Sequence, residues 1–166
     1  MIILGVDPGT AITGYGIIKN EGNRFRCLGH GVISTNPELD MAASLNSIHL
    51  KLSAIIEEYQ PAHMAVEQLF FCKNTKTALS IGQARGVILL TGMQKSLTIA
   101  EYTPLQVKQS VVGYGRAEKS QVQKMVTYIL GLNSMPHPDD AADALAIAIC
   151  HAHSHKLKTL IAGNRI

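Results

Sequence analysis

The sequence lacks several features that would assign it to a specialised class of protein. No run approaches the ~20 apolar residues of a membrane span. The first eight residues lack the basic segment of a signal peptide and its long apolar stretch. Only three cysteines occur, and Cys27, Cys72 and Cys150 are too widely spaced for a disulfide framework. We therefore expect a soluble, cytoplasmic protein that does not associate with membranes.

Linkers and low-complexity segments are also absent. The 14 glycines and 6 prolines are scattered rather than clustered, and no internal repeat is visible. A chain of 166 residues has the size of one compact domain, and such a chain buries roughly 70% of its unfolded surface without disulfides or metal staples. The net charge of +3 permits an anionic partner without requiring one. A single domain over residues 1–166 is expected.

Hydrophobic periodicity gives an order of elements. Apolar runs predict three strands at about 2–7, 13–19 and 25–34, joined by tight turns into an antiparallel meander. Apolar residues spaced three and four apart then predict a helix that ends before Pro61. Further strands are predicted at about 63–69 and 97–102, and further helices at about 75–95 and 104–112, from about 118 and from 139 or 140.

This order predicts an α/β protein. Its five-stranded mixed sheet should combine the three-strand antiparallel meander with two parallel strands, flanked by helices. If the fourth strand lies beside the first, their carboxyl ends meet at one edge, which is where open α/β sheets place their sites. The last helix is then expected to cap that edge.

Four acidic residues stand at that edge. Asp7 ends the first strand, Glu67 lies in the otherwise apolar fourth strand, and Asp140 and Asp143 share one face of the last helix at i and i+3. Taking an ionised carboxylate out of water costs several kcal/mol unless a cation or donors compensate it, and no basic residue adjoins any of the four in sequence. Oxygen ligands favour magnesium or manganese over zinc.

Each acid also has an ordinary structural explanation. Acidic residues in a first helical turn are common caps, which accounts for Asp139 and is an alternative for Asp140 and Asp143. Asp7 precedes Pro-Gly and is also explained as a turn initiator. Glu67 is harder to explain, because a glutamate is rarely buried without a partner. The combination favours a site for two metal ions, with Asp7 bridging them.

A set of motifs follows in a fixed order along nearly the whole chain. They are residues 3–10 (ILGVDPGT) with 13–16 (TGYG), 66–70 (VEQLF) with 73–74 (KN), 82–86 (GQARG), 107–109 (VKQ), 111–113 (VVG), 117–122 (AEKSQV) and 140–146 (DAADALA). Together they resemble the RuvC family of bacterial Holliday junction resolvases. The resemblance implies an RNase H-like fold, a homodimer, and magnesium-dependent resolution of four-way DNA junctions by paired symmetric nicks.

The resemblance also implies roles for individual residues. The acidic tetrad of the family falls on Asp7, Glu67, Asp140 and Asp143, which would hold two Mg²⁺ per site, with Mn²⁺ as a substitute. Basic residues near the active site of the family match Lys108 and Lys119. The aromatic residue that the family places against junction bases matches Phe70, and Lys73 in the same loop is expected to contact DNA. The branch-migration proteins RuvA and RuvB are the partners that it implies.

The basic residues have a simpler alternative, since most exposed lysines only face solvent. Lys119 differs because it follows a glycine loop at 113–115 and enters a helix N-terminus, a place suited to a phosphate. Lys76, Arg85 and Arg116 would extend the basic surface. Phe71 beside Phe70 is an alternative stacking residue.

Two further patterns bear on assembly and metal binding. His151 and His155 share a helical face, but no third ligand lies near them in sequence, so a solvated helix tail is the favoured interpretation. A two-fold symmetric junction calls for two equivalent active sites. The helix containing Gly82, Gly86 and Gly92 is the candidate dimer interface, because small residues allow close packing.

Two other functions remain open from the residues alone. Residues 7–10 (DPGT) also match the first phosphate loop of actin-like ATPases, although no second such loop occurs and the chain is short for two lobes. A module that binds junctions without cutting them is the other alternative, which the intact tetrad disfavours.

Overall fold

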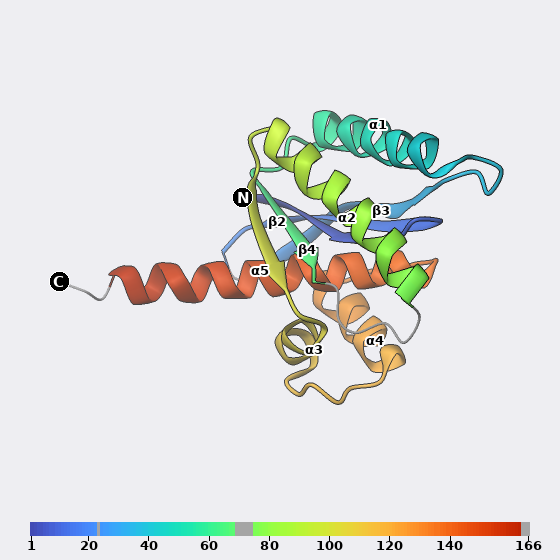
Figure 1. Ribbon diagram of the computed structural model, residues 1–166. Coiled ribbons are helices and arrows are strands. Elements are labelled where there is room, and N and C mark those ends of the chain that lie inside the picture. The colour runs from blue at the N-terminus through green and yellow to red at the C-terminus, as the bar shows by residue number, and fades with distance from the viewer. Residues whose placement is uncertain (23, 69–74, 164–166) are drawn as a thin grey trace.

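A five-stranded mixed sheet organises the computed structural model, which describes residues 1–22, 24–68 and 75–163 (Figure 1). The strand order is β3-β2-β1-β4-β5. β1, β2 and β3 pair antiparallel, whereas β1, β4 and β5 run parallel, so the predicted meander and the predicted neighbours β1 and β4 are confirmed. The strands are β1 (Ile2–Asp7), β2 (Ile12–Asn20), β3 (Phe25–Ser34), β4 (His63–Glu67) and β5 (Thr98–Tyr102).

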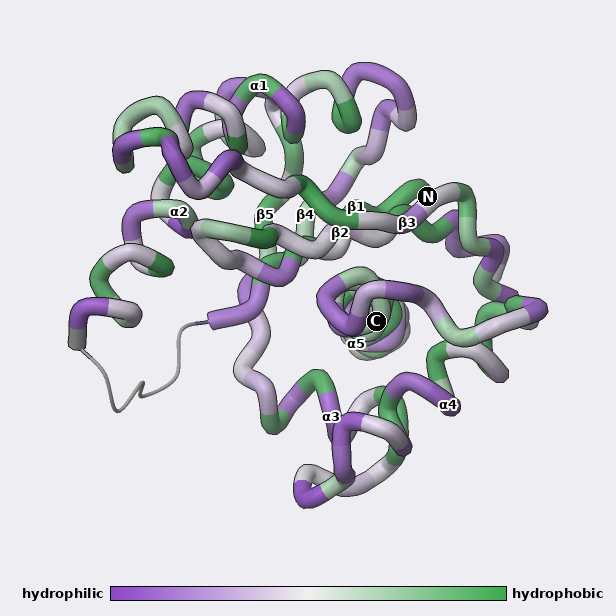
Figure 2. Tube along the Cα trace, turned by 90° about the vertical axis from the view of Figure 1, so that its right-hand side faces the viewer, coloured by the Kyte–Doolittle hydropathy of each residue, from purple (hydrophilic) through white to green (hydrophobic). Residues whose placement is uncertain are grey.

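Helices cover both faces of this sheet. α1 and α2 lie on one face, and α5 lies on the other, between the sheet and the pair α3 and α4 (Figure 2). Alternate residues of β1 supply the two cores, since Ile3 packs with α3, α4 and α5 while Leu4 and Val6 pack with α1 and α2. The helices are α1 (Met41–Tyr59), α2 (Thr75–Gln94), α3 (Pro104–Val112), α4 (Lys119–Leu130) and α5 (Asp139–Gly163).

Local capping chemistry fixes several helix boundaries. The Asp40 side chain accepts a hydrogen bond from the Ala43 backbone N–H at 2.7 Å, so α1 begins four residues before the apolar periodicity does. Thr103 and Gln106 form a capping box at the start of α3. No helix in the described part of the chain combines the length and hydropathy needed to cross a membrane.

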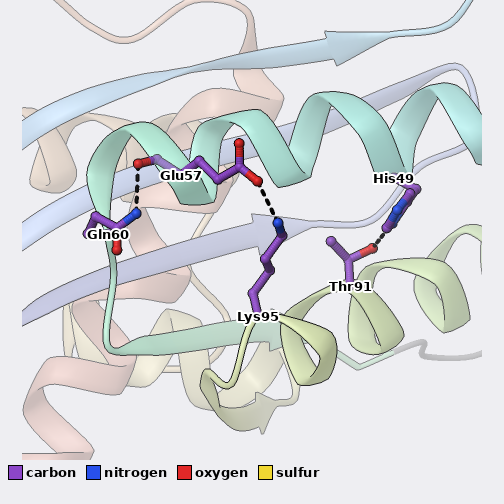
Figure 3. Close-up of polar contacts among 5 residues, drawn as sticks. All are labelled: His49, Glu57, Gln60, Thr91 and Lys95. Carbon is purple, nitrogen blue, oxygen red and sulfur yellow. Dashed lines mark hydrogen bonds and ion pairs between the residues drawn. The ribbon is translucent and has the colours of Figure 1, made fainter.

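The pair α1 and α2 is tied together by polar contacts (Figure 3). Lys95 Nζ lies 2.5 Å from Glu57 Oε1, and His49 Nδ1 lies 2.9 Å from Thr91 Oγ1. The Gln60 side-chain amide donates to the Glu57 carbonyl at 2.8 Å where α1 ends. The Lys95–Glu57 and His49–Thr91 contacts join α2, and the residue that follows it, to α1.

Glycines in β1 and β2 let α5 lie directly on the sheet. A Cβ atom on Gly5 would stand 2.0 Å from the Ala144 carbonyl oxygen, and one on Gly14 would stand 2.0 Å from the Asp140 carbonyl oxygen. The helix contributes small residues to the same contact, because Ala144 and Ala148 are fully buried. The first turn of this helix lies at the expected edge, against Gly14, but the rest of the helix crosses the face of the sheet, because the glycines remove the side chains that would hold it away (Figure 2).

Adding a methyl group at this contact should be costly. Gly5→Ala is expected to lower the free energy of unfolding by at least about 3 kcal/mol, because the new carbon overlaps helix backbone that cannot rotate away. Gly22→Ala is the matched control: it places the same methyl group in open space at a φ of 86°, where the left-handed conformation alone costs about 1–2 kcal/mol. Urea denaturation of both variants measures the difference, and equal losses would contradict the close-packing account.

Candidate active site

The acids of the sheet lie side by side at the carboxyl ends of two parallel strands. Val6 of β1 is in register with Val66 of β4. The next residues, Asp7 and Glu67, are therefore neighbours on adjacent strands at the same edge. Asp7 also pairs with Gly14 of β2, and the backbone of Asp140 lies against that glycine. Close approach of α5 thus places its first turn over the end of β1.

The four carboxylates are close enough to interact electrostatically, because the other three all act on the pKa of Asp7. Burial, followed by the charges of Glu67, Asp143 and Asp140 in that order, raises the pKa of Asp7 to about 8, while the Lys119 ammonium opposes the rise. Burial, followed by the charge of Asp143, raises the pKa of Glu67 to about 7, while Lys108 and Lys119 oppose the rise. Excess negative charge therefore gathers where β1, β4 and α5 meet.

Two lysines face these acids. Lys119 Nζ lies 2.8 Å from Asp143 Oδ2 and 3.6 Å from Asp139 Oδ2. Burial raises the pKa of Asp143, and the Lys119 ammonium opposes that rise. Lys108 of α3 lowers the pKa of Glu67. Asp143 has no basic neighbour in sequence, but the fold supplies one from the start of α4.

These side chains line one cleft between β4, α3, α4 and α5. Its polar wall consists of Glu67, Asp143, Lys108 and Lys119. Apolar side chains complete it and limit the access of water to the acids. They are Pro104, Val107, Val122 and Ala146.

The donor set of this cleft fits a hard divalent cation. All four acids offer carboxylate oxygens, which Mg²⁺ and Mn²⁺ prefer. Glu67 and Asp143 line the cleft itself, and the raised pKa of Asp7 and of Glu67 shows that their buried negative charge is under-compensated. Among the residues that the structure describes, no three His, Cys, Asp or Glu side chains already stand as ligands of one ion. Asp143 forms an ion pair with Lys119.

The other basic candidates have different surroundings. Arg85 forms an ion pair with Glu101 of β5, so its charge serves the contact between α2 and the sheet rather than an open basic surface. Lys76 and Arg116 are exposed on α2 and on the loop before α4. Phe70, Phe71 and Lys73 lie outside the described residues.

His151 is not part of a solvated tail, so that expectation is wrong. It is buried, with Nε2 2.9 Å from Nδ1 of His63 and Nδ1 2.9 Å from the Tyr102 hydroxyl. The ring of His155 packs edge-on against His63, at 5.1 Å between centroids. Burial, followed by the charge of His155, lowers the pKa of His63. The shared helical face of His151 and His155 was visible in the sequence, whereas their contacts with His63 and Tyr102 were not, because these residues come from β4 and β5.

Comparison with known proteins gives a consistent result. The model of the family described as "Crossover junction endodeoxyribonuclease RuvC" matches residues 3–151. A relative of that name from Halothermothrix orenii is 59% identical, with 95% of each chain covered. The structure of Thermus thermophilus RuvC is 34% identical with a TM-score of 0.88, covering 96% of this chain and 98% of that one. The structure of T. thermophilus RuvC in complex with a Holliday junction substrate has a TM-score of 0.91 at 34% identity, covering 96% and 97% of the two chains.

The raised pKa values predict how stability depends on pH. An acid whose pKa is higher in the folded than in the unfolded protein holds its proton in the folded state, so metal-free stability should fall as pH rises from about 4 through 7 and 8. Thermal unfolding between pH 5 and 8.5 measures this. Asp7→Asn should flatten the fall, because its amide cannot ionise, and Mg²⁺ should oppose it at high pH. A metal-free stability that rises over this interval would contradict the burial of uncompensated acids.

Proposed function

The chain belongs to the RuvC family of crossover junction endodeoxyribonucleases, and we propose that it resolves four-way DNA junctions by cutting phosphodiester bonds at the acidic cleft. The family match and the junction complex of T. thermophilus RuvC support this activity. The RNase H-like fold implied by the resemblance is confirmed by the likeness to T. thermophilus RuvC. The observation that carries the assignment to the cleft is the shared field of the four acids around Asp7.

Metal-dependent hydrolysis fits the residues present. We propose that Asp7, Glu67, Asp140 and Asp143 hold two Mg²⁺ ions, with Mn²⁺ as a substitute and Asp7 as the bridging ligand. When bound, such ions activate a water molecule and stabilise the leaving oxygen. Lys108, which faces Glu67 across the cleft, is suited to hold the scissile phosphate. The apolar wall of the cleft strengthens each of these charge interactions by limiting water.

DNA contacts are expected to extend from this cleft. Lys119 and Lys108 supply cations at its rim, while Phe70 and Lys73 follow Glu67 within six residues. The Gln68 backbone N–H donates to the Tyr102 carbonyl at 2.8 Å, so the chain stays tied to β5 up to the start of that loop. We propose that Phe70 stacks on a junction base, which contributes about 1–3 kcal/mol per base in other complexes.

The two alternatives gain no support. An actin-like ATPase clasps its nucleotide between two related lobes, and the family match covers residues 3–151 with a nuclease instead. A junction-binding module without activity would not need four acids gathered where β1, β4 and α5 meet. By the same resemblance, we propose that the protein works in the cytoplasm with RuvA and RuvB.

Removing one metal ligand should separate binding from cutting. Asp7→Asn is expected to lower the rate of junction cleavage at least about 100-fold, because it weakens ion binding at the centre of the tetrad. Junction binding should persist, since the change also removes negative charge near DNA phosphates. Gel-shift and cleavage assays on a labelled four-way junction, with and without Mg²⁺, measure both quantities. Glu38→Gln, an exposed acid, is the control. Parental cleavage by Asp7→Asn would contradict the site.

We further propose that two copies pair through α2. Leu79, Leu90 and Met93 are 67%, 57% and 63% exposed and lie on one face of this helix, at spacings of eleven and three residues. Gly86 lies on the same face, where an added Cβ would meet none of the described residues within 4 Å. Large apolar side chains gathered on one face mark interaction surfaces. Gly92 belongs to the opposite face, where an added Cβ would meet Met64 of the sheet at 2.3 Å.

A charge in the middle of this face should break the pair. Leu90→Glu is expected to sediment as a monomer, because the buried carboxylates of two copies would face each other across the two-fold axis. Tyr128→Glu is the matched control, since it places the same charge on another exposed residue, on α4. A Leu90→Glu variant that sediments as a dimer would contradict an interface at α2.

A further inference from the structure

Lys119 forms an ion pair with Asp143, which is one of the four proposed metal ligands. Its ammonium lies 2.8 Å from Oδ2 of Asp143 and 3.6 Å from Oδ2 of Asp139, both on the first turns of α5. The charge of Lys119 also acts on Asp7 and Glu67 from the same position. Asp140 acts on Lys119 as well, so one flexible side chain interacts with all four proposed metal ligands.

The backbone of Lys119 is fixed while its side chain can move. Lys119 is the first residue of α4, directly after Glu118, whose side chain and that of Gln121 form a capping box. The side chain of Lys119 is 52% exposed, whereas that of Asp143 is only 28% exposed. The ammonium can therefore leave for solvent by rotating about its own four-carbon stem, without moving α4 or Asp143.

We propose that Lys119 is a tethered counter-ion that keeps Asp143 occupied until a divalent cation displaces it. A cation bound to Asp143 would repel an ammonium held on the same carboxylate. The 2.8 Å contact shows that Asp143 is already paired with a cation that belongs to the chain itself.

Displacement would link ion binding to DNA binding. The freed ammonium stays at the rim of the cleft, where the scissile phosphate is proposed to lie. A phosphate that draws Lys119 away from Asp143 favours ion binding, and an ion that expels Lys119 favours phosphate binding, because the coupling is reciprocal. Lys119 would thereby discourage ion loading in the absence of substrate.

A titration of the DNA-free protein with Mn²⁺ tests the displacement directly. Lys119→Met keeps most of the stem and removes the charge, and it is expected to bind Mn²⁺ roughly tenfold more tightly than the parent, as read from the free Mn²⁺ signal in electron paramagnetic resonance. Lys108→Met is the matched control: Lys108 lines the same cleft but makes no ion pair among the described residues, so its removal should increase the affinity less. Equal increases in the two variants, or no increase in Lys119→Met, would overturn the proposal.

A second measurement on the unaltered protein does not depend on any variant. The ¹⁵N-labelled ammonium of Lys119 should give a nuclear magnetic resonance signal that shifts or is lost as Mg²⁺ saturates the cleft. A signal unchanged at saturation would overturn displacement. The inference rests on the proposed function, since it assumes that the cleft binds divalent ions. If no protein in the titration binds Mn²⁺, the metal site itself fails, whereas equal binding by the parent and Lys119→Met refutes only the displacement.

Discussion

The whole site depends on the contact of α5 with bare backbone in β1 and β2. Gly5 and Gly14 leave no side chain between the sheet and the helix. The backbone of α5 comes so close to these glycines that it takes up the space where a Cβ atom would be. Only at that separation does the first turn of α5 stand over the end of β1, so that Asp140 and Asp143 act on Asp7. Packing against the sheet, rather than any local preference of the helix, therefore assembles the tetrad.

Burial makes this assembly electrostatically costly, and the cost explains its chemistry. Four acids converge at one edge of the sheet, and the raised pKa of Asp7 and Glu67 records how poorly they are compensated. A binding site for divalent cations needs this excess of negative charge, held in place before the ion arrives. Lys119 supplies partial compensation from α4, a helix that reaches the cleft only because α3 and α4 pack against the far side of α5 (Figure 2).

Local patterns in the sequence were sufficient for the elements and insufficient for the contacts between them. Periods of two and of three to four residues located the strands and helices, and the acids stood out because they interrupted apolar segments. The meeting of Lys119 with Asp143 has no such signal, since it joins two helices across a loop. The same holds for His63 and His151, which are 88 residues apart and meet through sheet register and helix packing. Glycines alternating within a strand at 14 and 16 were a usable sign of close backbone approach, yet they do not say which element approaches.

The central claim is that acids from three separate segments form one receptor for divalent ions. Crystals of the protein soaked in Mn²⁺ and measured at a wavelength where manganese scatters anomalously test this most directly. The account predicts anomalous peaks bounded by Asp7, Glu67, Asp140 and Asp143, with carboxylate oxygens as ligands. Crystals that show manganese only elsewhere on the molecule, with the cleft empty at saturating concentration, would contradict it.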